Sequence, residues 1–184
     1  MRIISGKWKS RSLDFPKSRE FRPTQDRVKE SLFSILAPQL SNAIVWDLCS
    51  GSGALGIESL SRGAAHVTFV DTNTTYIKKN TQSLLTAAPP LSKDQFQIIK
   101  SPVSRFLDSA PPTATLILMD PPWQNTQVYT DILTHPILHQ CLAKGAFLLC
   151  EYTKKYTPQF PPQLHIQKTY TYGASTLAII TGSC

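Results

Sequence analysis

The chain has 184 residues, of which 41% are hydrophobic, and it carries a formal net charge of +7. A chain of this length buries about 70% of the surface that it exposes when unfolded, so we expect one domain that folds without a metal ion or a disulfide. No apolar run approaches the ~20 residues of a membrane span, and the first residues lack the apolar core of a signal peptide. These observations argue against a membrane-spanning class and favour a cytoplasmic protein.

The cysteines and histidines show no metal-ligand spacing. The four cysteines form no CxxC pair, and three of them lie in or beside apolar patterns. Such cysteines are typical of small core residues in a reducing compartment. The four histidines form no ligand pattern either. We therefore predict no metal site.

The positive charge is concentrated at the N-terminus. Residues 1–30 contain nine Lys and Arg against four Asp and Glu, a net +5. A basic face of this kind suits a polyanion, because each phosphate neutralised by Lys or Arg releases counterions. A solvated surface that keeps the protein soluble explains the charge equally well.

The first elements precede the main domain. Residues 3–15 alternate short apolar and basic residues, which predicts a two-stranded ribbon. Within it, Trp8 could stack on a base or anchor the ribbon to the domain, and anchoring is favoured. Residues 25–36 have apolar side chains at helical spacing, with Thr24 as N-cap. Pro38 is expected to end this helix.

Residues 44–71 predict a strand, a glycine-rich turn, a helix and a second strand that ends in Asp71. Glycines let the backbone turn tightly and approach a ligand, while a helix N-terminus presents unpaired N–H groups. The terminal acid stands where a βαβ unit places a carboxylate on a ribose. The spacing fits NAD, FAD or S-adenosylmethionine alike. The candidate cofactor-binding residues here are Asp47, Gly51, Ser52, Gly53 and Asp71.

The remaining elements alternate in type. The pattern predicts helices over 74–85, 103–107 and 129–142, and strands over 96–99, 115–119, 146–150, 165–170 and 176–181. The last two strands are expected to pair as an antiparallel hairpin. The order predicts an α/β fold with a doubly wound, mostly parallel, seven-stranded sheet.

The fourth strand closes on Asp120-Pro121-Pro122-Trp123. In an open α/β sheet this turn faces the same crevice as the glycine loop. Two prolines supply no N–H donors, so the turn offers only acceptors, including the Asp120 carboxylate. Trp123 adds a flat face on which a heterocycle could stack. The alternative is a proline loop with a core Trp.

This turn suits the exocyclic amine of a base, whose lone pair is delocalised into the ring. Two acceptors can hold both amine hydrogens and aim the lone pair at an electrophilic methyl group, and Asp120 can take up the departing proton. The sulfonium of S-adenosylmethionine supplies such a methyl group. A hydride-transfer enzyme has no use for this turn.

At this point the chain resembles the bacterial RsmD-like methyltransferases, which modify guanine N2 in small-subunit ribosomal RNA. The resemblance runs from Arg2 to about Ile180. Its quoted segments are RIISGKWKSRSLDFP, RPTQDRVKESLF, DLCSGSGALGIESLSRGA and DPPW. The resemblance implies a Rossmann-like class I methyltransferase domain over residues 23–184 and an RNA-facing N-terminal hairpin extension over residues 1–22.

The resemblance also implies roles for individual residues. S-adenosylmethionine is the expected cofactor, and 16S rRNA in a small-subunit assembly particle is the expected substrate of a monomeric enzyme. Arg22 and Thr24 lie in a segment that closes over the methionine end of the cofactor in similar enzymes. After the third strand the family carries an acidic or amide residue, whereas this chain has Ser101-Pro102, so the adenine is expected to meet Ser101 and Val103. The expected phosphate contacts are Lys7, Lys9, Arg11 and Arg27.

Two competing functions remain. An adenine-N6 methyltransferase acting on DNA or RNA could use the same turn, because the turn serves any exocyclic amine. A catalytically silent RNA-binding assembly factor could keep the cofactor fold. The resemblance favours the guanine-N2 methyltransferase, with Asp120, Pro121, Pro122 and Trp123 as the expected catalytic residues.

Overall fold

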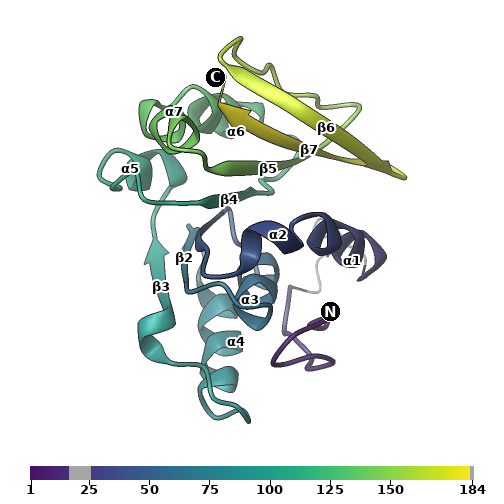
Figure 1. Cartoon of the computed structure of the whole chain (residues 1–184), viewed down its shortest axis with the longest axis vertical. Coiled ribbons are helices and arrows are strands. Elements are labelled where there is room, and N and C mark those ends of the chain that lie inside the picture. Colours follow the sequence, from purple (N-terminus) through teal and green to yellow (C-terminus); the bar gives the residue numbers. More distant parts are fainter. Residues whose placement is uncertain (17–25, 183–184) are drawn as a thin grey trace.

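The computed structural model describes residues 1–16 and 26–182. Seven strands form one sheet in the order β3-β2-β1-β4-β5-β7-β6, with helices on both faces (Figure 1). The strands are β1 (Ile44–Leu48), β2 (His66–Asp71), β3 (Phe96–Lys100), β4 (Leu116–Met119), β5 (Phe147–Thr153), β6 (Leu164–Tyr172) and β7 (Ser175–Gly182). The helices are α1 (Asp26–Ile35), α2 (Ala37–Leu40), α3 (Ala54–Ser61), α4 (Thr75–Leu85), α5 (Val103–Leu107), α6 (Thr126–Leu133) and α7 (Pro136–Ala143), with a short 3₁₀ turn, η1 (Lys93–Gln95).

The sheet has a parallel part and an antiparallel edge. Strands β3, β2, β1, β4 and β5 run parallel, while β7 pairs antiparallel with both β5 and β6. The strand order reverses at β1, which lies between β2 and β4. In such a sheet ligands bind outside the carboxyl ends of the strands at this switch point. The predicted doubly wound fold with a C-terminal hairpin is confirmed.

The two faces of the sheet have separate hydrophobic cores. One core joins the N-terminal segment and helices α1 to α4 to side chains such as Val45 and Leu118. The other joins α5, α6 and α7 to side chains such as Trp46 and Ile117. All four residues of β4 are buried, as expected for a central strand covered on both faces.

The N-terminal segment, residues 1–16, belongs to the first of these cores. Its two ends meet in an antiparallel Arg2–Ser12 bridge, so the expected ribbon is reduced to one isolated bridge closed by turns. Trp8 is only 2% exposed, and its indole N–H donates to the Pro89 carbonyl at 2.7 Å. Trp8 therefore anchors the segment, as favoured from the sequence, and does not offer its face for stacking on a base.

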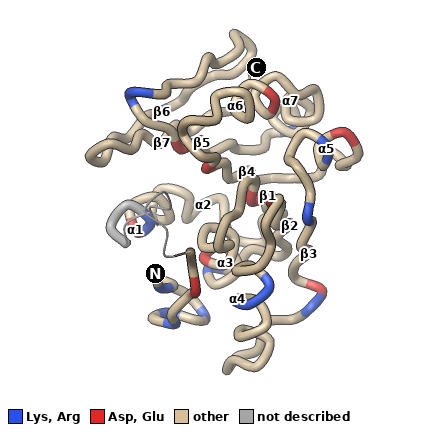
Figure 2. Tube along the Cα trace, turned by 180° about the vertical axis from the view of Figure 1, so that it is seen from behind, with Lys and Arg blue, Asp and Glu red and all other residues tan. Residues whose placement is uncertain are grey.

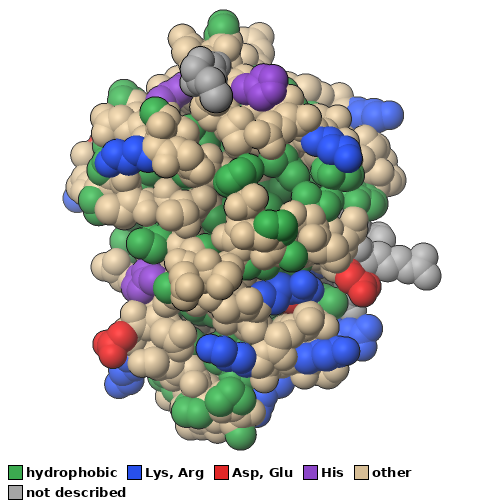
Figure 3. Space-filling model, in the orientation of Figure 1, with side chains coloured by type: hydrophobic (Ala, Val, Ile, Leu, Met, Phe, Trp, Pro, Cys, Tyr) green, Lys and Arg blue, Asp and Glu red, His purple; other side chains and the backbone are tan. Residues whose placement is uncertain are grey.

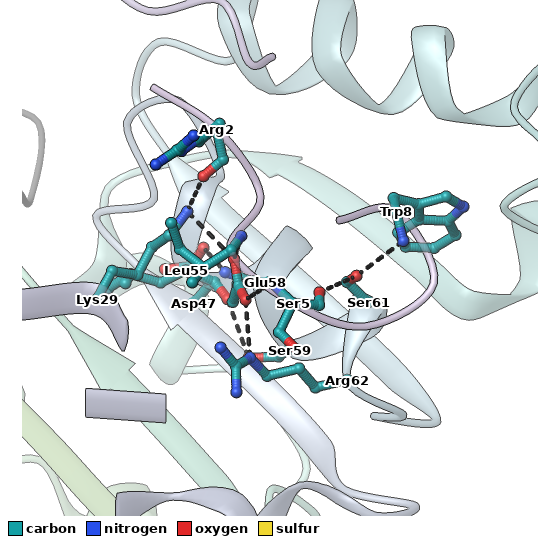
Figure 4. Close-up of polar contacts among 12 residues, drawn as sticks. Arg2, Ser5, Trp8, Lys29, Asp47, Leu55, Glu58, Ser59, Ser61 and Arg62 are labelled. Atoms are coloured by element: carbon teal, nitrogen blue, oxygen red, sulfur yellow. Dashed lines mark hydrogen bonds and ion pairs between the residues drawn. The ribbon is translucent and has the colours of Figure 1, made fainter. Parts of the chain in front are cut away.

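A buried carboxylate, Glu58 on α3, holds this segment in place (Figure 4). Its two oxygens accept the backbone N–H groups of Ile4 and Ser5 at 2.8 and 3.0 Å. It also pairs with Lys29 of α1 at 3.2 Å and with Arg62 at 2.7 Å. A buried carboxylate is costly unless it is paired and hydrogen-bonded in this way. Glu58 thus ties both the N-terminal segment and α1 to the helix that follows the glycine loop.

Several element boundaries differ from the prediction, and three of the differences matter for the fold or the site. The helix expected over 129–142 is two helices, because Pro136 lacks an N–H and starts α7, with His135 as its N-cap. Pro38 does not end a helix but lies in the first turn of α2. Strand β5 extends beyond Cys150 and includes Glu151. None of the described helices is both long and apolar enough for a bilayer crossing.

Candidate active site

A cavity of about 980 Å³ lies at the carboxyl ends of the central strands. Its wall is built from the loops after β1, β2, β3 and β4, together with the end of β5 and one side of α6. The predicted site residues that line it are Gly51, Asp71, Ser101, Val103, Asp120, Pro121, Pro122 and Trp123. Residues predicted from separate motifs, over 70 positions apart, therefore share one cavity.

Three N–H groups of the glycine loop and the start of α3 donate to acceptors within the protein. The Gly51 N–H donates to Asp71 Oδ2 at 2.8 Å, and the Gly53 N–H donates to the Ser50 carbonyl at 2.7 Å. The Gly56 N–H, in the first turn of α3, donates to Asp47 Oδ2 at 2.9 Å. The expectation of unpaired N–H groups at this loop is wrong for these three positions, because acids and a carbonyl of the chain occupy them.

Two of the glycines serve packing. Gly53 has a φ of +76°, and a Cβ built on it would lie 3.3 Å from the Phe69 ring. A Cβ on Gly56 would lie 2.4 Å from the same ring. The close approach of α3 to β2 therefore requires small residues here, as in other helix–strand contacts of βαβ units. The neighbouring Ser52 is 2% exposed and is not among the residues that line the cavity.

Asp47 lies beneath the loop and not in the cavity wall. It is 2% exposed, and its carboxylate contacts the Gly56 N–H. Burial raises the pKa of Asp47 to about 8, and the Asp71 charge adds to this, while the Gly56 hydrogen bond opposes it. Asp47 thus shapes the loop that borders the cavity.

Asp71 ends β2 at the cavity wall. Its two oxygens accept the N–H groups of Gly51 and Asn73, each at 2.8 Å. Each carboxylate oxygen has a second acceptor site, and the side chain is only partly buried. Asp71 can therefore fix the glycine loop and accept hydroxyl donors from a ligand at the same time.

The turn after β4 places its polar groups on the cavity. Asp120 and Trp123 are partly exposed there, and Trp123 belongs to neither hydrophobic core among the described residues. The alternative of a core Trp is therefore wrong. The buried Tyr129 hydroxyl donates to the Glu151 carbonyl at 2.7 Å and lies 3.4 Å from the Pro121 carbonyl. Tyr129 thus links the turn to β5.

The cavity wall is acidic although the chain as a whole is basic. Four of its described residues are carboxylic acids, and none is Lys, Arg or His. The acids are Asp71, Asp120, Asp131 and Glu151. A cleft lined by one sign of charge concentrates ligands of the opposite sign. The Gly51, Gly53 and Gly56 N–H groups are already bound within the protein, and four carboxylic acids line the wall, so the site suits a cationic ligand better than the anionic pyrophosphate of NAD or FAD.

The sequence prediction missed Glu151. This residue is 5% exposed, follows the apolar run of β5 and lines the cavity. A signal was present, because an acid follows the apolar run of strand four, at Asp120, and of strand five, at Glu151. In neighbouring parallel strands of equal length such acids come side by side.

Ser101 and Val103, the residues after the third strand that were predicted to contact the adenine, line the cavity as well. The Ser101 N–H donates to the Asp71 carbonyl at 3.1 Å, and the Ser101 hydroxyl donates to the Pro102 carbonyl at 3.1 Å. The hydroxyl oxygen can still accept a donor from a ligand. Val103 follows as the first residue of α5.

Three of the predicted RNA contacts lie apart from the described cavity wall. Lys7, Lys9 and Arg11 are exposed on the N-terminal turn. Figure 2 shows Lys and Arg on this turn and acids near β1, β4 and β5. Lys and Arg also gather on the lower part of the face in Figure 3. Arg22, Thr24 and the side chain of Arg27 lie outside the described residues.

A comparison with protein-family profiles agrees with this geometry. The profile described as "Conserved hypothetical protein 95" matches residues 1–181. The chain belongs to this family. The RsmD-like resemblance predicted from the sequence is confirmed, because curated relatives carry the name ribosomal RNA small subunit methyltransferase D.

The matches to curated relatives cover different shares of the chain. YlbH of Bacillus subtilis, named as a proposed rRNA methyltransferase, is 34% identical over 97% of each chain. Ribosomal RNA small subunit methyltransferase D of Escherichia coli is 36% identical over 124 residues, which cover 67% of this chain and 61% of that protein.

Solved structures resemble the whole fold. A proposed methyltransferase of Escherichia coli, yhhF, has a TM-score of 0.77 at 26% identity and covers 99% of this chain and 97% of that one. HI0767 of Haemophilus influenzae, a proposed methylase, has a TM-score of 0.72 at 27% identity, covering 98% of this chain and 97% of that one.

Proposed function

We propose that this protein is an S-adenosylmethionine-dependent methyltransferase that modifies the exocyclic N2 of a guanine in small-subunit ribosomal RNA. The observation that carries the proposal is the position of Asp120 and its proline turn in an acidic cavity beside the glycine loop and Asp71. The names of the family's curated relatives support the choice of ribosomal RNA.

The residues of the cavity fit this cofactor. When bound, S-adenosylmethionine supplies an electrophilic methyl group carried on a positively charged sulfur. Asp71 offers free acceptor sites for the ribose hydroxyls, and the other wall carboxylates favour a cation. Ser101 and the start of α5 at Val103 are the proposed contacts of the adenine. Arg22 and Thr24 remain proposed contacts outside the described residues.

The catalytic chemistry belongs to the turn after β4. The Asp120 carboxylate and the Pro121 carbonyl are the two acceptors for the amine hydrogens, and the rigid prolines keep them in place. Asp120 then takes up the proton that the methylated nitrogen releases. Trp123 stacks on the base, since its ring is partly exposed to the cavity.

The basic N-terminal turn is the proposed RNA-facing surface. Exposed Lys7, Lys9 and Arg11 would neutralise phosphates, and Arg27 is proposed to join them. We propose that the substrate is 16S rRNA in a small-subunit assembly particle, bound by a monomer in the cytoplasm. Residues 1–22 would form the RNA-facing extension and residues 23–184 the methyltransferase domain.

Methyl transfer with a labelled donor tests the function. The acceptors are naked 16S rRNA, isolated small-subunit particles and duplex DNA, and the labelled nucleoside is identified after digestion. The proposal predicts N2-methylguanosine from the rRNA or the particle and no label in DNA. N6-methyladenosine would overturn the choice of base. Specific RNA binding without any methyl transfer would favour the alternative function, a catalytically silent assembly factor.

A further inference from the structure

Two carboxylic acids meet at the same edge of the sheet. Strands β4 and β5 run parallel, with Met119 opposite Cys150 as the last pair of the register. The next residue on each strand is an acid, Asp120 and Glu151. Neighbouring strands are about 4.8 Å apart, and both side chains border the cavity. Glu151 therefore lies beside the carboxylate to which the proposed function assigns the proton.

No cation among the described residues of the cavity wall compensates this pair. Glu151 forms no described ion pair, and its side chain is hydrogen-bonded with Ser175 of β7. Burial raises the pKa of Asp120 well above its usual range, and the charge of Glu151 adds to the increase. Burial raises the pKa of Glu151 as well.

A purely structural role does not account for a carboxylate at this position. The contact between Glu151 and Ser175 joins β5 to β7, but an amide oxygen could accept the same hydrogen bond. A second charge next to Asp120 is unfavourable for folding, because Glu151 is buried and the two like charges repel each other without a compensating cation in the described cavity wall. Such arrangements occur at sites where proton affinity is tuned.

We propose that Glu151 is a positioning residue for the methyl transfer, whose negative charge beside Asp120 makes that carboxylate a stronger acceptor for the amine proton. The inference rests on the proposed function. In the step, a bond forms between the amine nitrogen and the methyl carbon while the bond between that carbon and sulfur breaks, leaving its electron pair on sulfur. The nitrogen then gives one proton to Asp120, next to Glu151.

Other titratable groups also face Asp120. Asp47 approaches it from the end of β1, and Cys49 from the loop that follows. Tyr129 approaches from α6 and Cys150 from β5. Burial raises the pKa of Cys49, Cys150 and Tyr129, so these three stay neutral near pH 7. Among these neighbours, the charge of Glu151 makes the largest contribution to the raised pKa of Asp120.

The first test follows the titration of Asp120 in the free protein. Carbon-13 NMR of carboxyl-labelled aspartate gives the midpoint, and Asp120→Asn identifies the signal. Glu151→Gln removes the neighbouring charge, so the Asp120 midpoint should fall by roughly one pH unit or more. Glu151→Asp keeps the charge and should keep the wild-type midpoint. Ser175→Ala removes the hydrogen bond with β7 but keeps the Glu151 carboxylate, so the midpoint should fall clearly less than in Glu151→Gln.

An unchanged midpoint in Glu151→Gln would overturn the proposal, and so would an equal fall in Ser175→Ala. This titration needs neither RNA nor a methyl donor, so its outcome is independent of the proposed function.

The second test is the pH profile of single-turnover methylation. Activity that needs ionised Asp120 is lost as the pH falls through its pKa, so the acidic limb in Glu151→Gln should move to lower pH. A limb at the wild-type position would contradict the role of Glu151.

Discussion

Two acids flank the glycine loop, Asp47 and Asp71. Their carboxylates differ in whether they can still accept a hydrogen bond from a ligand. Asp47 is buried under the loop and holds the start of α3 through the Gly56 N–H. Asp71 holds Gly51 and Asn73 but remains partly exposed to the cavity. Only Asp71 can both shape the loop and bind a ligand.

Replacement of Asp71 therefore tests the cofactor site. In Asp71→Ala, the ribose hydroxyls and the loop N–H groups lose an acceptor, which should weaken S-adenosylhomocysteine binding by about 1–3 kcal/mol. Isothermal titration calorimetry measures the change. Asp94→Ala, at an exposed position before β3, serves as the control and should bind as the wild type does. Wild-type affinity in Asp71→Ala would place the ribose elsewhere.

Gly6 tests how tightly the N-terminal segment docks. Gly6 has a φ of +84°, and a Cβ there would lie 1.9 Å from the Ser61 carbonyl oxygen. Gly145 has a similar φ of +90° but has nothing within 4 Å of its Cβ position. Both alanine variants share the backbone strain, so Gly6→Ala should lose about 1–3 kcal/mol more stability than Gly145→Ala. Urea unfolding decides this, and equal losses would show that the segment can shift without cost.

At the site, the sequence predicted which residues come together better than it predicted what each one does. The DPPW turn and Asp71 end predicted strands, so the topology alone brings them to one edge. The roles of Asp47 and Gly53 depend on the path of the loop, in which Cys49 and Gly51 have φ values of +60° and +55°. That path decides which groups face the cavity, and the residue pattern does not encode it directly.

At the scale of elements, α4 connects the N-terminal segment to the glycine loop. The buried Asn80 side chain accepts the Asp14 N–H at 2.8 Å and donates to the Asp14 carbonyl at 2.9 Å. It also donates to the Ser52 carbonyl at 2.9 Å. Pro16, two residues after Asp14, lines the cavity. One amide thus fixes both the loop and the segment that leads to the cavity wall.

Loss of this amide should affect stability and cofactor binding together. Asn80→Ala leaves buried backbone groups unpaired, so we expect a loss of about 1–3 kcal/mol in urea unfolding and weaker S-adenosylhomocysteine binding. The control, Lys79→Ala, removes an exposed ion pair with Asp14 and should cost less than about 1 kcal/mol. If Asn80→Ala binds the cofactor normally despite lower stability, the loop does not depend on this contact.

The fold was predictable from the sequence where a single residue pattern dominates a segment. Continuous apolar runs identified the buried strands, and the glycine loop fixed the first βαβ unit. The break between α6 and α7 was missed because apolar residues keep helical spacing across Pro136, although that proline could have signalled it. The N-terminal ribbon was overestimated, because Ile3, Trp8 and Leu13 pack into the domain core and Glu58 holds the Ile4 and Ser5 N–H groups.

At the scale of the whole molecule, the charge is divided between a basic N-terminal turn and an acidic cavity. Under the proposed function, this division would let the basic turn attract RNA while the acidic cavity repels other anions. Neutralising Lys7, Lys9 and Arg11 together should weaken RNA binding and reduce its salt dependence by up to about 0.7–0.9 in log–log slope per lost contact. Cofactor affinity should not change.

A matched triple variant controls for total charge. Lys93, Lys144 and Lys168 are exposed on other parts of the molecule, and their neutralisation removes the same charge. Filter binding to rRNA at several salt concentrations compares the two variants. An equal reduction in slope for both would mean that net charge, and not the N-terminal turn, determines RNA affinity.

The most direct test of the proposed chemistry is single-turnover methylation of the small-subunit particle by Asp120 variants. If the carboxylate acts as the transition state forms, Asp120→Ala should slow transfer by a factor on the order of 10² to 10⁴ with little change in cofactor or RNA affinity. Asp120→Asn should keep more activity because its amide oxygen still accepts one hydrogen bond. The control is Asp108→Ala, at an exposed position, which should transfer the methyl group at the wild-type rate. Transfer by Asp120→Ala at the wild-type rate would contradict the assignment of the chemistry to this turn.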